Sequence, residues 1–204
     1  LEMENLILSD LKEEYDSLSA DGFRVLAIAY KDMPEKKSVY SKEDEKNLVL
    51  IGYLAFLDPP KPSAKETIRC LKNLGIEFKV LTGDNELVTK KICSHVGLDV
   101  HEIVTGDKLE TTSDLALREI VKTTTVFARL SPLQKERVIH ALHENGQIVG
   151  YLGDGINDAP ALKTSDVGIS VNNAVDIAKE SADIILLEKS LLVLEDGVLE
   201  GRRT

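Results

Sequence analysis

The sequence contains no tryptophan and few other aromatic residues, which together make up 4% of its 204 residues. Hydrophobic residues of all kinds reach 43%, which excludes a disordered chain. The core must therefore be built mainly from aliphatic side chains. The length fits one large domain, or one domain with part of another.

Long apolar runs and paired cysteines are also missing. The longest uncharged apolar run, Leu48–Leu57, is far shorter than the roughly 20 residues of a membrane-spanning helix. Cys70 and Cys93 form no CxxC motif and lack metal-ligand spacing, so we interpret them as reduced thiols of a cytosolic protein. Residues 1–4 carry two acids and no base, unlike a secretion signal, and we interpret them as a cut end.

Basic residues are fewer than acidic residues, and the formal net charge is −10. A nucleic-acid-binding domain needs a basic face, so this balance argues against a nucleic-acid partner. We interpret the excess of acid as a solvated surface.

From residue 58 onward, short apolar segments alternate with helical patterns. The sequence predicts strands over residues 76–81, 125–128, 147–152, 167–171 and 184–187. Capping boxes at Ser63 with Glu66 and at Ser131 with Gln134 predict two helix starts. Apolar strands separated by helices indicate a mainly parallel sheet covered on both faces. The predicted fold class is α/β, with a doubly wound parallel sheet.

Residues 1–57 follow another pattern. A helix is predicted over Asn5–Ala20, followed by strands over Phe23–Tyr30 and Leu48–Leu57 with a charged linker between them. One helix and two strands are too few to bury their own faces. We therefore expect residues 1–57 to be part of an α+β domain and residues 58–204 to form a second domain.

Two polar loops follow predicted strands of the second domain. Thr82-Gly83-Asp84-Asn85 comes after residues 76–81, and Gly153–Asp158 comes after residues 147–152. Ligands of open parallel sheets bind beyond the carboxyl ends of the strands. Carboxylates suit Mg²⁺, and the amides of glycine turns favour phosphate oxygens. The sequence therefore predicts that these loops face Mg²⁺ and a phosphoryl group.

The loops have features of other phosphate-binding motifs only in part. Gly153-Asp154-Gly155 begins like a dinucleotide-binding fingerprint, but Asp158 stands where that motif needs Gly or Ala. The GxxxxGK[ST] phosphate loop does not occur in the sequence. A plain turn with solvated acids stays open as an alternative.

Arg129 and Lys135 flank the end of the strand predicted over residues 125–128. Lys135 falls in the first turn of the following helix, where the helix dipole disfavours a cation. This position indicates that an anion offsets the cost. The alternative is that both residues are ordinary surface cations.

Four motifs stand in the order found in P-type cation-transporting ATPases. They are Asp58-Pro59-Pro60-Lys61, Thr82-Gly83-Asp84, the segment from Ala128-Arg129 to Lys135, and GDGINDAPAL from Gly153 to Leu162. Over nearly its whole length the chain resembles these pumps, whose phosphorylation domain has the haloacid-dehalogenase-like fold. The segments FLDPPK, VLTGDN and FARLSPLQKERVI most resemble the bacterial magnesium-importing branch.

The resemblance implies roles for the residues of these motifs. Lys135 would neutralise charge on a phosphoryl group, and Asp154 would bind Mg²⁺ together with Asp158. The residues expected at the catalytic centre are Thr82, Gly83, Asp84, Lys135, Asn157 and Asp158. Those expected to serve the nucleotide or the hinge between domains are Arg24, Asp58, Lys61 and Arg129. The implied cofactors are Mg²⁺ and ATP, and the implied partners are the transported cation and the remaining pump domains.

One departure from the family pattern is decisive for the expected activity. The phosphorylated aspartate of the family lies in a DKTGT motif, which this sequence lacks. The segment Asp107-Lys108-Leu109-Glu110-Thr111-Thr112 resembles it but lacks the glycine, falls in a connecting loop and stands in the wrong chain order. We expect residues 1–57 to be the C-terminal part of a nucleotide-binding domain, and residues 58–204 a phosphorylation domain without its first strand.

The resemblance further implies that the full pump carries Mg²⁺ and exposes this region at the cytoplasmic face of the cell membrane. The fragment itself is expected to be soluble and inactive. Two alternatives stay open: a stand-alone phosphatase of the same fold, and an isolated nucleotide- or Mg²⁺-binding module.

Overall fold

The computed structural model of the chain describes residues 2–33 and 38–203, with side chains described from residue 8 onward in the first helix. Residues 34–37, within the predicted linker, lie outside the described residues. The chain divides into two compact units, Leu1–Asp58 (unit 1) and Pro59–Thr204 (unit 2).

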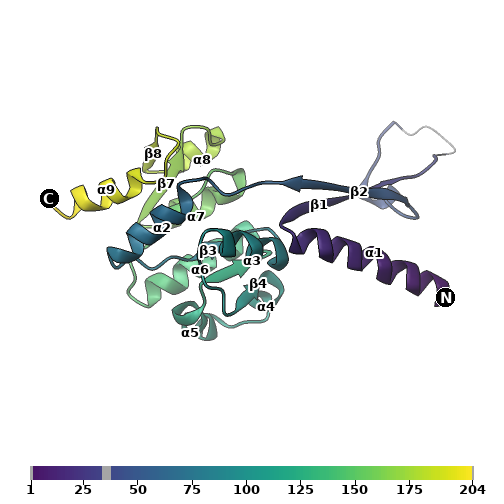
Figure 1. Cartoon of the computed structure of the whole chain (residues 1–204), viewed down its shortest axis with the longest axis horizontal. Helices are drawn as coiled ribbons and strands as arrows, with labels where there is room; N and C mark the ends of the chain where they lie inside the picture. The colour runs from purple at the N-terminus through teal and green to yellow at the C-terminus, as the bar shows by residue number, and fades with distance from the viewer. Residues whose placement is uncertain (1, 34–37, 204) are drawn as a thin grey trace. The chain divides into compact units, whose positions relative to one another are not determined.

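Unit 1 consists of one helix and one antiparallel hairpin (Figure 1). Helix α1 covers Glu2–Ala20, strands β1 and β2 cover Phe23–Tyr30 and Val49–Leu57, and a short 3-10 turn, η1, covers Lys42–Asp44. The predicted strands are therefore confirmed almost to the residue. The Tyr53 hydroxyl ties the hairpin to α1 by donating to the Leu11 carbonyl at 3.1 Å.

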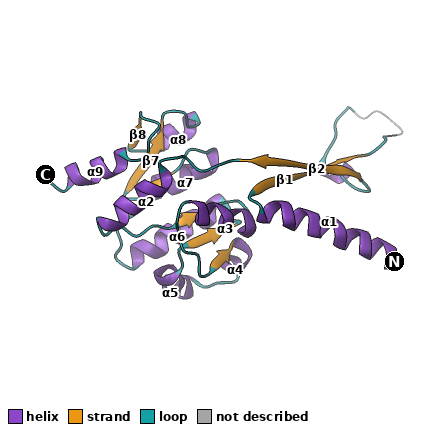
Figure 2. Ribbon diagram, viewed as in Figure 1, coloured by secondary structure: helices purple, strands orange, loops and turns teal. Residues whose placement is uncertain are grey.

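Unit 2 alternates helices and short strands (Figure 2). Its strands are β3 (Val80–Leu81), β4 (Ile103–Thr105), β5 (Val126–Ala128), β6 (Gly150–Leu152), β7 (Val167–Val171) and β8 (Ile184–Leu186). Its helices are α2 (Ala64–Asn73), α3 (Glu86–His95), α4 (Gly106–Glu110), α5 (Asp114–Thr123), α6 (Pro132–Glu144), α7 (Ala159–Thr164), α8 (Asp176–Ser181) and α9 (Val193–Gly201), with a 3-10 turn, η2, over Ile156–Asp158.

The strands of unit 2 form two parallel sheets, in the orders β3-β5-β4 and β6-β7-β8. The predicted α/β class with parallel pairing is confirmed, but the described strands do not join into one continuous sheet. Strands β3 and β6 each lie at an edge. Leu81 of β3 and Val149 next to β6 both pack against the same two hydrophobic clusters, so these edges border a shared core.

Strands β3 and β6 begin later than the sequence predicts, at residue 80 rather than 76 and at residue 150 rather than 147, while β5 and β8 are each one residue shorter. The apolar pattern extends from residue 76, yet β3 contains only Val80 and Leu81. Its partner β5 is short, and pairing with it begins where the Val80 amide donates to the Thr125 carbonyl at 2.8 Å. An apolar run becomes a strand only where a neighbouring strand meets its backbone groups.

The two predicted capping boxes have different outcomes. At Ser131 the box is confirmed, because its hydroxyl accepts from the Gln134 amide while the Gln134 side chain accepts from the Ser131 amide. At Ser63 the predicted helix start is confirmed, with Ser63 as the N-cap of α2, but the capping box is wrong, because the Ser63 side chain makes no cap hydrogen bond. The Ser63 hydroxyl instead accepts a hydrogen bond from the Leu191 amide at 3.0 Å, which ties the start of α2 to the segment before α9.

The core of unit 2 is mainly aliphatic, as the composition requires. Buried Leu, Ile, Val and Ala side chains make up most of three clusters, and Phe127 on β5 is the largest fully buried side chain. Helix α6 contributes Val138 to one cluster and Ile139 to another. This helix therefore spans the region between the two sheets and fixes the loops beside it.

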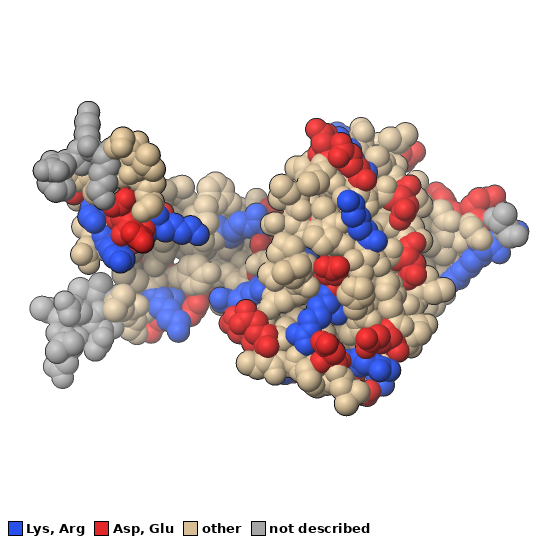
Figure 3. All heavy atoms as spheres, turned by 180° about the vertical axis from the view of Figure 1, so that it is seen from behind, with Lys and Arg blue, Asp and Glu red and all other residues tan. Residues whose placement is uncertain are grey.

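None of the helices in the described part of the chain is both long and apolar enough to cross a bilayer. Acidic and basic side chains are interspersed on the surface seen in Figure 3. The negative net charge is thus spread over that face.

Candidate functional site

The loop that follows β6 is built around the carboxylate of Asp158. Its Oδ1 accepts hydrogen bonds from the Lys135 ammonium and from the Tyr151 hydroxyl, both at 2.7 Å, while Oδ2 accepts from the Gly155 amide at 3.1 Å. The Asp158 and Lys135 side chains are only 13% and 10% exposed. The anion that the sequence predicts near Lys135 is therefore, in this structure, a carboxylate of the protein itself.

Burial and pairing act in opposite directions on the pKa of Asp158. Burial raises it, but the hydrogen bonds from Lys135 and Tyr151 and the nearby ammonium charge outweigh this effect, so the net pKa is below its usual value. For Tyr151, burial and the carboxylates of Asp158 and Asp154 all raise the phenol pKa. The stable state at neutral pH is an ionised Asp158 held by a neutral phenol.

Asp154 is the exposed carboxylate of the same loop, and its side chain makes no hydrogen bond or ion pair within the described residues. Its backbone is fixed, because its carbonyl accepts from the Val175 amide at 3.1 Å. The described residues form no cluster of three or more His, Cys, Asp or Glu side chains suited to a metal. One free carboxylate beside a second, engaged one fits Mg²⁺, which keeps most of its waters.

Two small residues allow the loop to close. A side chain at Gly153 would place a Cβ 2.5 Å from the Asp158 Cβ and 3.0 Å from Cε1 of Tyr151. The buried Ser170 hydroxyl donates to the Gly153 carbonyl at 2.9 Å. Close packing of backbone against side chain thus sets the position of Asp158. Asn157 is exposed at the tip of this loop.

The loop after β3 is held by the segment that follows β5. The Asp84 amide donates to the Thr82 hydroxyl at 3.1 Å, which makes a tight turn around Gly83. The Leu130 amide donates to the Thr82 carbonyl at 2.9 Å, and the Arg129 amide donates to the Asp84 carbonyl at 2.8 Å. The structure therefore brings Thr82, Gly83 and Asp84 next to Arg129.

Arg129 has a left-handed backbone with a φ of 54°, which is uncommon for a residue with a side chain. Its guanidinium donates to both carboxylate oxygens of Glu86, at 2.6 and 3.3 Å. The hydrogen bond from Arg129 lowers the pKa of Glu86, and this exceeds the opposing effect of burial. The ion pair thus connects the residue that follows β5, Arg129, to the first residue of α3, Glu86, which follows the Thr82 loop.

The start of helix α6 connects the two loops. Leu130, just before this helix, binds the Thr82 loop, and Lys135 in its first turn binds Asp158. The Gln134 side chain also donates to the Gly106 carbonyl at 2.9 Å. A Cβ at Gly106 would lie 2.3 Å from the Arg129 carbonyl oxygen, so only glycine fits there. Both loops are thus positioned by one rigid element.

Three other predicted residues belong to neither of these loops. Arg24 is exposed on β1, and Asp58 is the last residue of unit 1. Lys61 is exposed in the segment that leads into α2 of unit 2. Asp107, the first residue of the segment that resembles DKTGT, is exposed in the first turn of α4, which follows β4.

The chain matches two family models described as haloacid dehalogenase-like hydrolase, one over residues 7–166 and one over residues 134–200. The first covers most of the chain. The chain belongs to the haloacid dehalogenase-like hydrolases. This membership agrees with the parallel α/β architecture and with polar loops at the strand ends.

Similar proteins include cation-transporting ATPases. The chain is 52% identical over 202 residues to "Magnesium-transporting ATPase, P-type 1" of Escherichia coli K12, which covers 99% of this chain and 22% of that protein. It is 56% identical over 191 residues to the protein of the same name from Salmonella typhimurium LT2, covering 93% and 21%. A calcium-transporting ATPase of Listeria monocytogenes is 37% identical over 198 residues, covering 96% and 22%. The chain thus spans about a fifth of the length of these relatives.

Several residues of the site carry no signal of their role in the sequence of this haloacid dehalogenase-like chain. Tyr151 falls within a predicted apolar strand, where a phenol ring is expected to be an ordinary part of the hydrophobic core. Glu86 has the position of an acid that stabilises the first turn of a helix. Gly106 directly precedes the segment that resembles DKTGT, and nothing in the local sequence marks it as part of the site. Their partners lie far away in the sequence, so no local pattern marks them.

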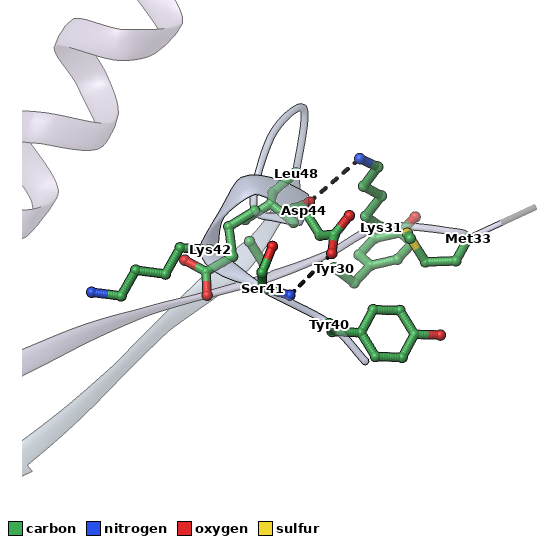
Figure 4. Close-up of a pocket in the computed structure, with 10 residues that line it drawn as sticks. Tyr30, Lys31, Met33, Tyr40, Ser41, Lys42, Asp44 and Leu48 are labelled. Carbon is green, nitrogen blue, oxygen red and sulfur yellow. Dashed lines mark hydrogen bonds between the residues drawn. The ribbon is translucent and has the colours of Figure 1, made fainter. Parts of the chain in front are cut away.

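Each unit contains a cavity. Figure 4 shows the larger of the two, of about 580 Å³, in unit 1, where the linker meets the end of β1 and the start of β2 and the Lys31 ammonium donates to the Asp44 carbonyl at 3.4 Å. The second, of about 390 Å³, lies in unit 2 and is lined in part by Lys72, Lys79 and Lys122. Neither is lined by a residue of the two loops.

Proposed function

We propose that this chain is part of the cytoplasmic ATP-hydrolysing region of a P-type ATPase that transports Mg²⁺ through an aspartyl-phosphate intermediate. Unit 1 is the end of the nucleotide-binding domain, and unit 2 is the phosphorylation domain without its first strand. Support comes from the motifs and from the similarity to magnesium-transporting ATPases over 99% of the chain.

The observation that carries this proposal is the pairing of Lys135 with Asp158 beside the free carboxylate of Asp154. A cation and an available acid at the end of a parallel strand are what a phosphoryl group and its metal require. A purely structural ion pair would not need a second, unpaired acid four residues away.

Asp154 would hold Mg²⁺ in this proposal, and the ion would supply charge neutralisation to the phosphoryl oxygens when bound. Asp158 has hydrogen bonds on both of its oxygens. These three hydrogen bonds leave about one of its four lone-pair positions for a metal, on Oδ2, so its main task is to fix Lys135. Asn157 is placed at the loop tip to meet the phosphoryl group.

Lys135 and Thr82 act on the phosphoryl group itself. An ammonium carries three N–H donors, so Lys135 can keep Asp158 and still donate to phosphoryl oxygens. The Thr82 hydroxyl accepts from Asp84, which leaves its own hydrogen free to donate to a phosphoryl oxygen. Preorganised donors of this kind stabilise the charge that develops during transfer.

The nucleophilic aspartate would come from a strand outside this sequence. The unpaired edges of β3 and β6 border the same core and are the natural place for such a strand. A parallel strand there would end between the Thr82 loop and the Asp154 loop. On the nucleotide side, Arg24, Asp58, Lys61 and Arg129 would contact ATP or the hinge between domains.

The test of this function is phosphorylation of the full pump by radiolabelled ATP. Asp154→Asn is expected to reduce the acid-stable phosphoenzyme by about 100-fold or more, because the metal ligand is lost. The matched control is Asp107→Asn, an exposed acid of α4, which is expected to label like the wild type. Equal labelling of both variants would contradict the proposal.

The chain alone gives a second test, because it lacks the nucleophile. Incubation with ATP or acetyl phosphate and Mg²⁺ is expected to leave no phosphate on the chain. Stoichiometric label on Asp107 or Asp84, mapped by mass spectrometry, would instead support a stand-alone phosphatase.

Metal binding can be followed on the same chain by backbone amide shifts during Mg²⁺ titration. The amides of residues 153–158 and 82–85 are expected to move first, with weak affinity, because the ion stays mostly hydrated. Shifts confined to Glu43–Glu45 of unit 1 would count against a site at Asp154.

A further inference from the structure

Tyr151 is a buried residue that the proposed mechanism does not use. Its ring lies in the hydrophobic cluster that contains Ile139, Ala161 and Leu162, and the residue is only 8% exposed. Its hydroxyl nevertheless reaches the site, where it shares Oδ1 of Asp158 with the Lys135 ammonium. A phenylalanine would fill the same space in the cluster without this hydrogen bond.

We propose that Tyr151 is a positioning residue for phosphoryl transfer, which sets the direction of the Lys135 ammonium by fixing the carboxylate of Asp158. This inference rests on the proposed function. Tyr151 acts on Lys135 indirectly, because its hydroxyl contacts Asp158 and Asp158 in turn contacts Lys135.

The geometry explains why a third donor is needed. The Gly155 amide fixes Oδ2 of Asp158, but a single anchor leaves the carboxylate free to rotate about it. The Tyr151 hydroxyl fixes Oδ1 as well, so both oxygens have set positions. Lys135 has a flexible side chain, and its ammonium is then held on one fixed oxygen while two of its donors remain for phosphoryl oxygens.

Gly153 completes the arrangement. The absence of a side chain there lets the Asp158 Cβ and the Tyr151 ring approach the same backbone position. A larger residue would separate the phenol from the carboxylate. The close approach of the Tyr151 ring and the Asp158 carboxylate therefore requires a glycine at position 153.

Tyr151→Phe removes the hydroxyl and keeps the ring. In the full pump it is expected to lower kcat about tenfold, the scale of one hydrogen bond to a charged group, with the KM for ATP changed less than about twofold. The matched control is Tyr53→Phe, which removes a phenol hydrogen bond in unit 1 and is expected to leave kcat unchanged. An unchanged kcat for Tyr151→Phe would overturn the inference.

A double-mutant cycle separates positioning from a general structural effect. If Tyr151 acts through Lys135, adding Tyr151→Phe to Lys135→Ala should lower kcat by less than about twofold more, because the group being positioned is gone. The same tenfold loss in both backgrounds would show that Tyr151 acts independently, and would overturn the inference. Wild-type kcat for Lys135→Ala alone would also overturn it, together with the role proposed for Lys135.

Rescue and a direct structural measurement cover the case in which the phenylalanine variant folds poorly. Replacing Tyr151 with 4-aminophenylalanine keeps a donor on a ring of similar size, and is expected to restore most of kcat. In the 204-residue chain, the Gly155 amide should exchange its hydrogen at least about threefold faster in Tyr151→Phe, because its acceptor is less fixed. Unchanged exchange at Gly155 or failure of the amino variant to restore kcat would count against the inference. Loss of labelling in Asp154→Asn with normal kcat in Tyr151→Phe would retain the proposed function and reject this inference alone.

Discussion

Unit 1 and unit 2 bury their apolar side chains to very different extents. Phe127 on β5 of unit 2 is fully buried, whereas Phe56 on β2 of unit 1 is 49% exposed. Unit 2 has helices packed on its sheets, whereas within the described residues of unit 1 the hairpin packs against one helix, α1. A two-stranded sheet with one helix lacks the opposing layer that would cover its other face.

This difference shows where a precise site can be built. In unit 2, buried side chains hold the ends of β3 and β6 so that Lys135 and Asp158 meet at 2.7 Å. In unit 1, Arg24 lies on an exposed strand among exposed apolar neighbours such as Leu26. A covering surface from the rest of the proposed nucleotide-binding domain would be needed to give Arg24 a comparable setting.

The largest expected effect compares two phenylalanines. Phe127→Ala should lower the free energy of unfolding of unit 2 by about 3–5 kcal/mol, because it opens a cavity in the core. Phe56→Ala should cost under ~1 kcal/mol in the isolated chain, since its side chain is half exposed. Denaturant unfolding with probes in each unit measures both values.

Measuring the same two phenylalanine variants in the full pump tests whether the difference between the units persists there. If other parts of the nucleotide-binding domain cover the hairpin, Phe56→Ala should become clearly more costly there than in the chain. Equal costs in the two contexts would show that the hairpin stays uncovered.

The next largest effect is on catalysis, and it compares the loss of a cation in unit 2 with the loss of a proposed nucleotide-binding residue in unit 1. Lys135→Ala in the full pump should raise the barrier to phosphoenzyme formation by about 2–4 kcal/mol, the scale of losing a preorganised electrostatic group. Arg24→Ala should instead act mainly through the KM for ATP. Rapid-quench kinetics at saturating ATP distinguish the two, and wild-type rates for Lys135→Ala would make it a structural cation.

A pair of glycines gives a smaller effect on stability. Gly106→Ala should destabilise unit 2 by about 1–3 kcal/mol, because its Cβ would lie 2.3 Å from the Arg129 carbonyl oxygen. Gly52→Ala on β2 meets no atom within 4 Å and should be neutral or slightly stabilising. Thermal unfolding of the two variants measures the contrast, and a neutral Gly106→Ala would show that the Arg129 segment can move aside.

The smallest effect is the pH dependence contributed by Asp166. The Val149 amide and then the His143 ring, as hydrogen-bond donors, lower the pKa of this carboxyl. Its stabilising effect is therefore complete above the unfolded pKa of about 3.9 and is lost as the pH falls through the folded pKa.

Asp166→Asn keeps an acceptor for Val149 and removes the charge, so stability should fall less steeply below about pH 4. Asp107→Asn is the control, because the Asp107 side chain accepts no hydrogen bond in the described structure. Equal slopes for wild type and Asp166→Asn in acid titrations followed by circular dichroism would exclude this contribution.

Local features were well predicted from the sequence. The hairpin strands of unit 1 and β7 of unit 2 fall where the apolar patterns place them. The Ser131 capping box forms because its two partners are three residues apart. The polar loops at the strand ends follow from the alternation of strands and helices.

The predictions that failed or were missing depend on distant partners. Ser63 has the sequence of a helix cap, yet its hydroxyl binds Leu191, 128 residues away. Strand β3 is cut short by the length of its neighbour β5. A pattern within a few residues cannot contain this information.

The sequence by itself determined the parallel α/β class, the aliphatic core, and the acids and lysine of the candidate site. These follow from composition, periodicity and short-range hydrogen bonding, which act within a few residues. Only the tertiary structure decided that Lys135 pairs with Asp158 across 23 residues, that Arg129 binds Glu86 across 43, and that Tyr151 completes the site. Such pairs form because packing of α6 against both sheets brings distant segments within hydrogen-bonding distance, and no local preference encodes that distance.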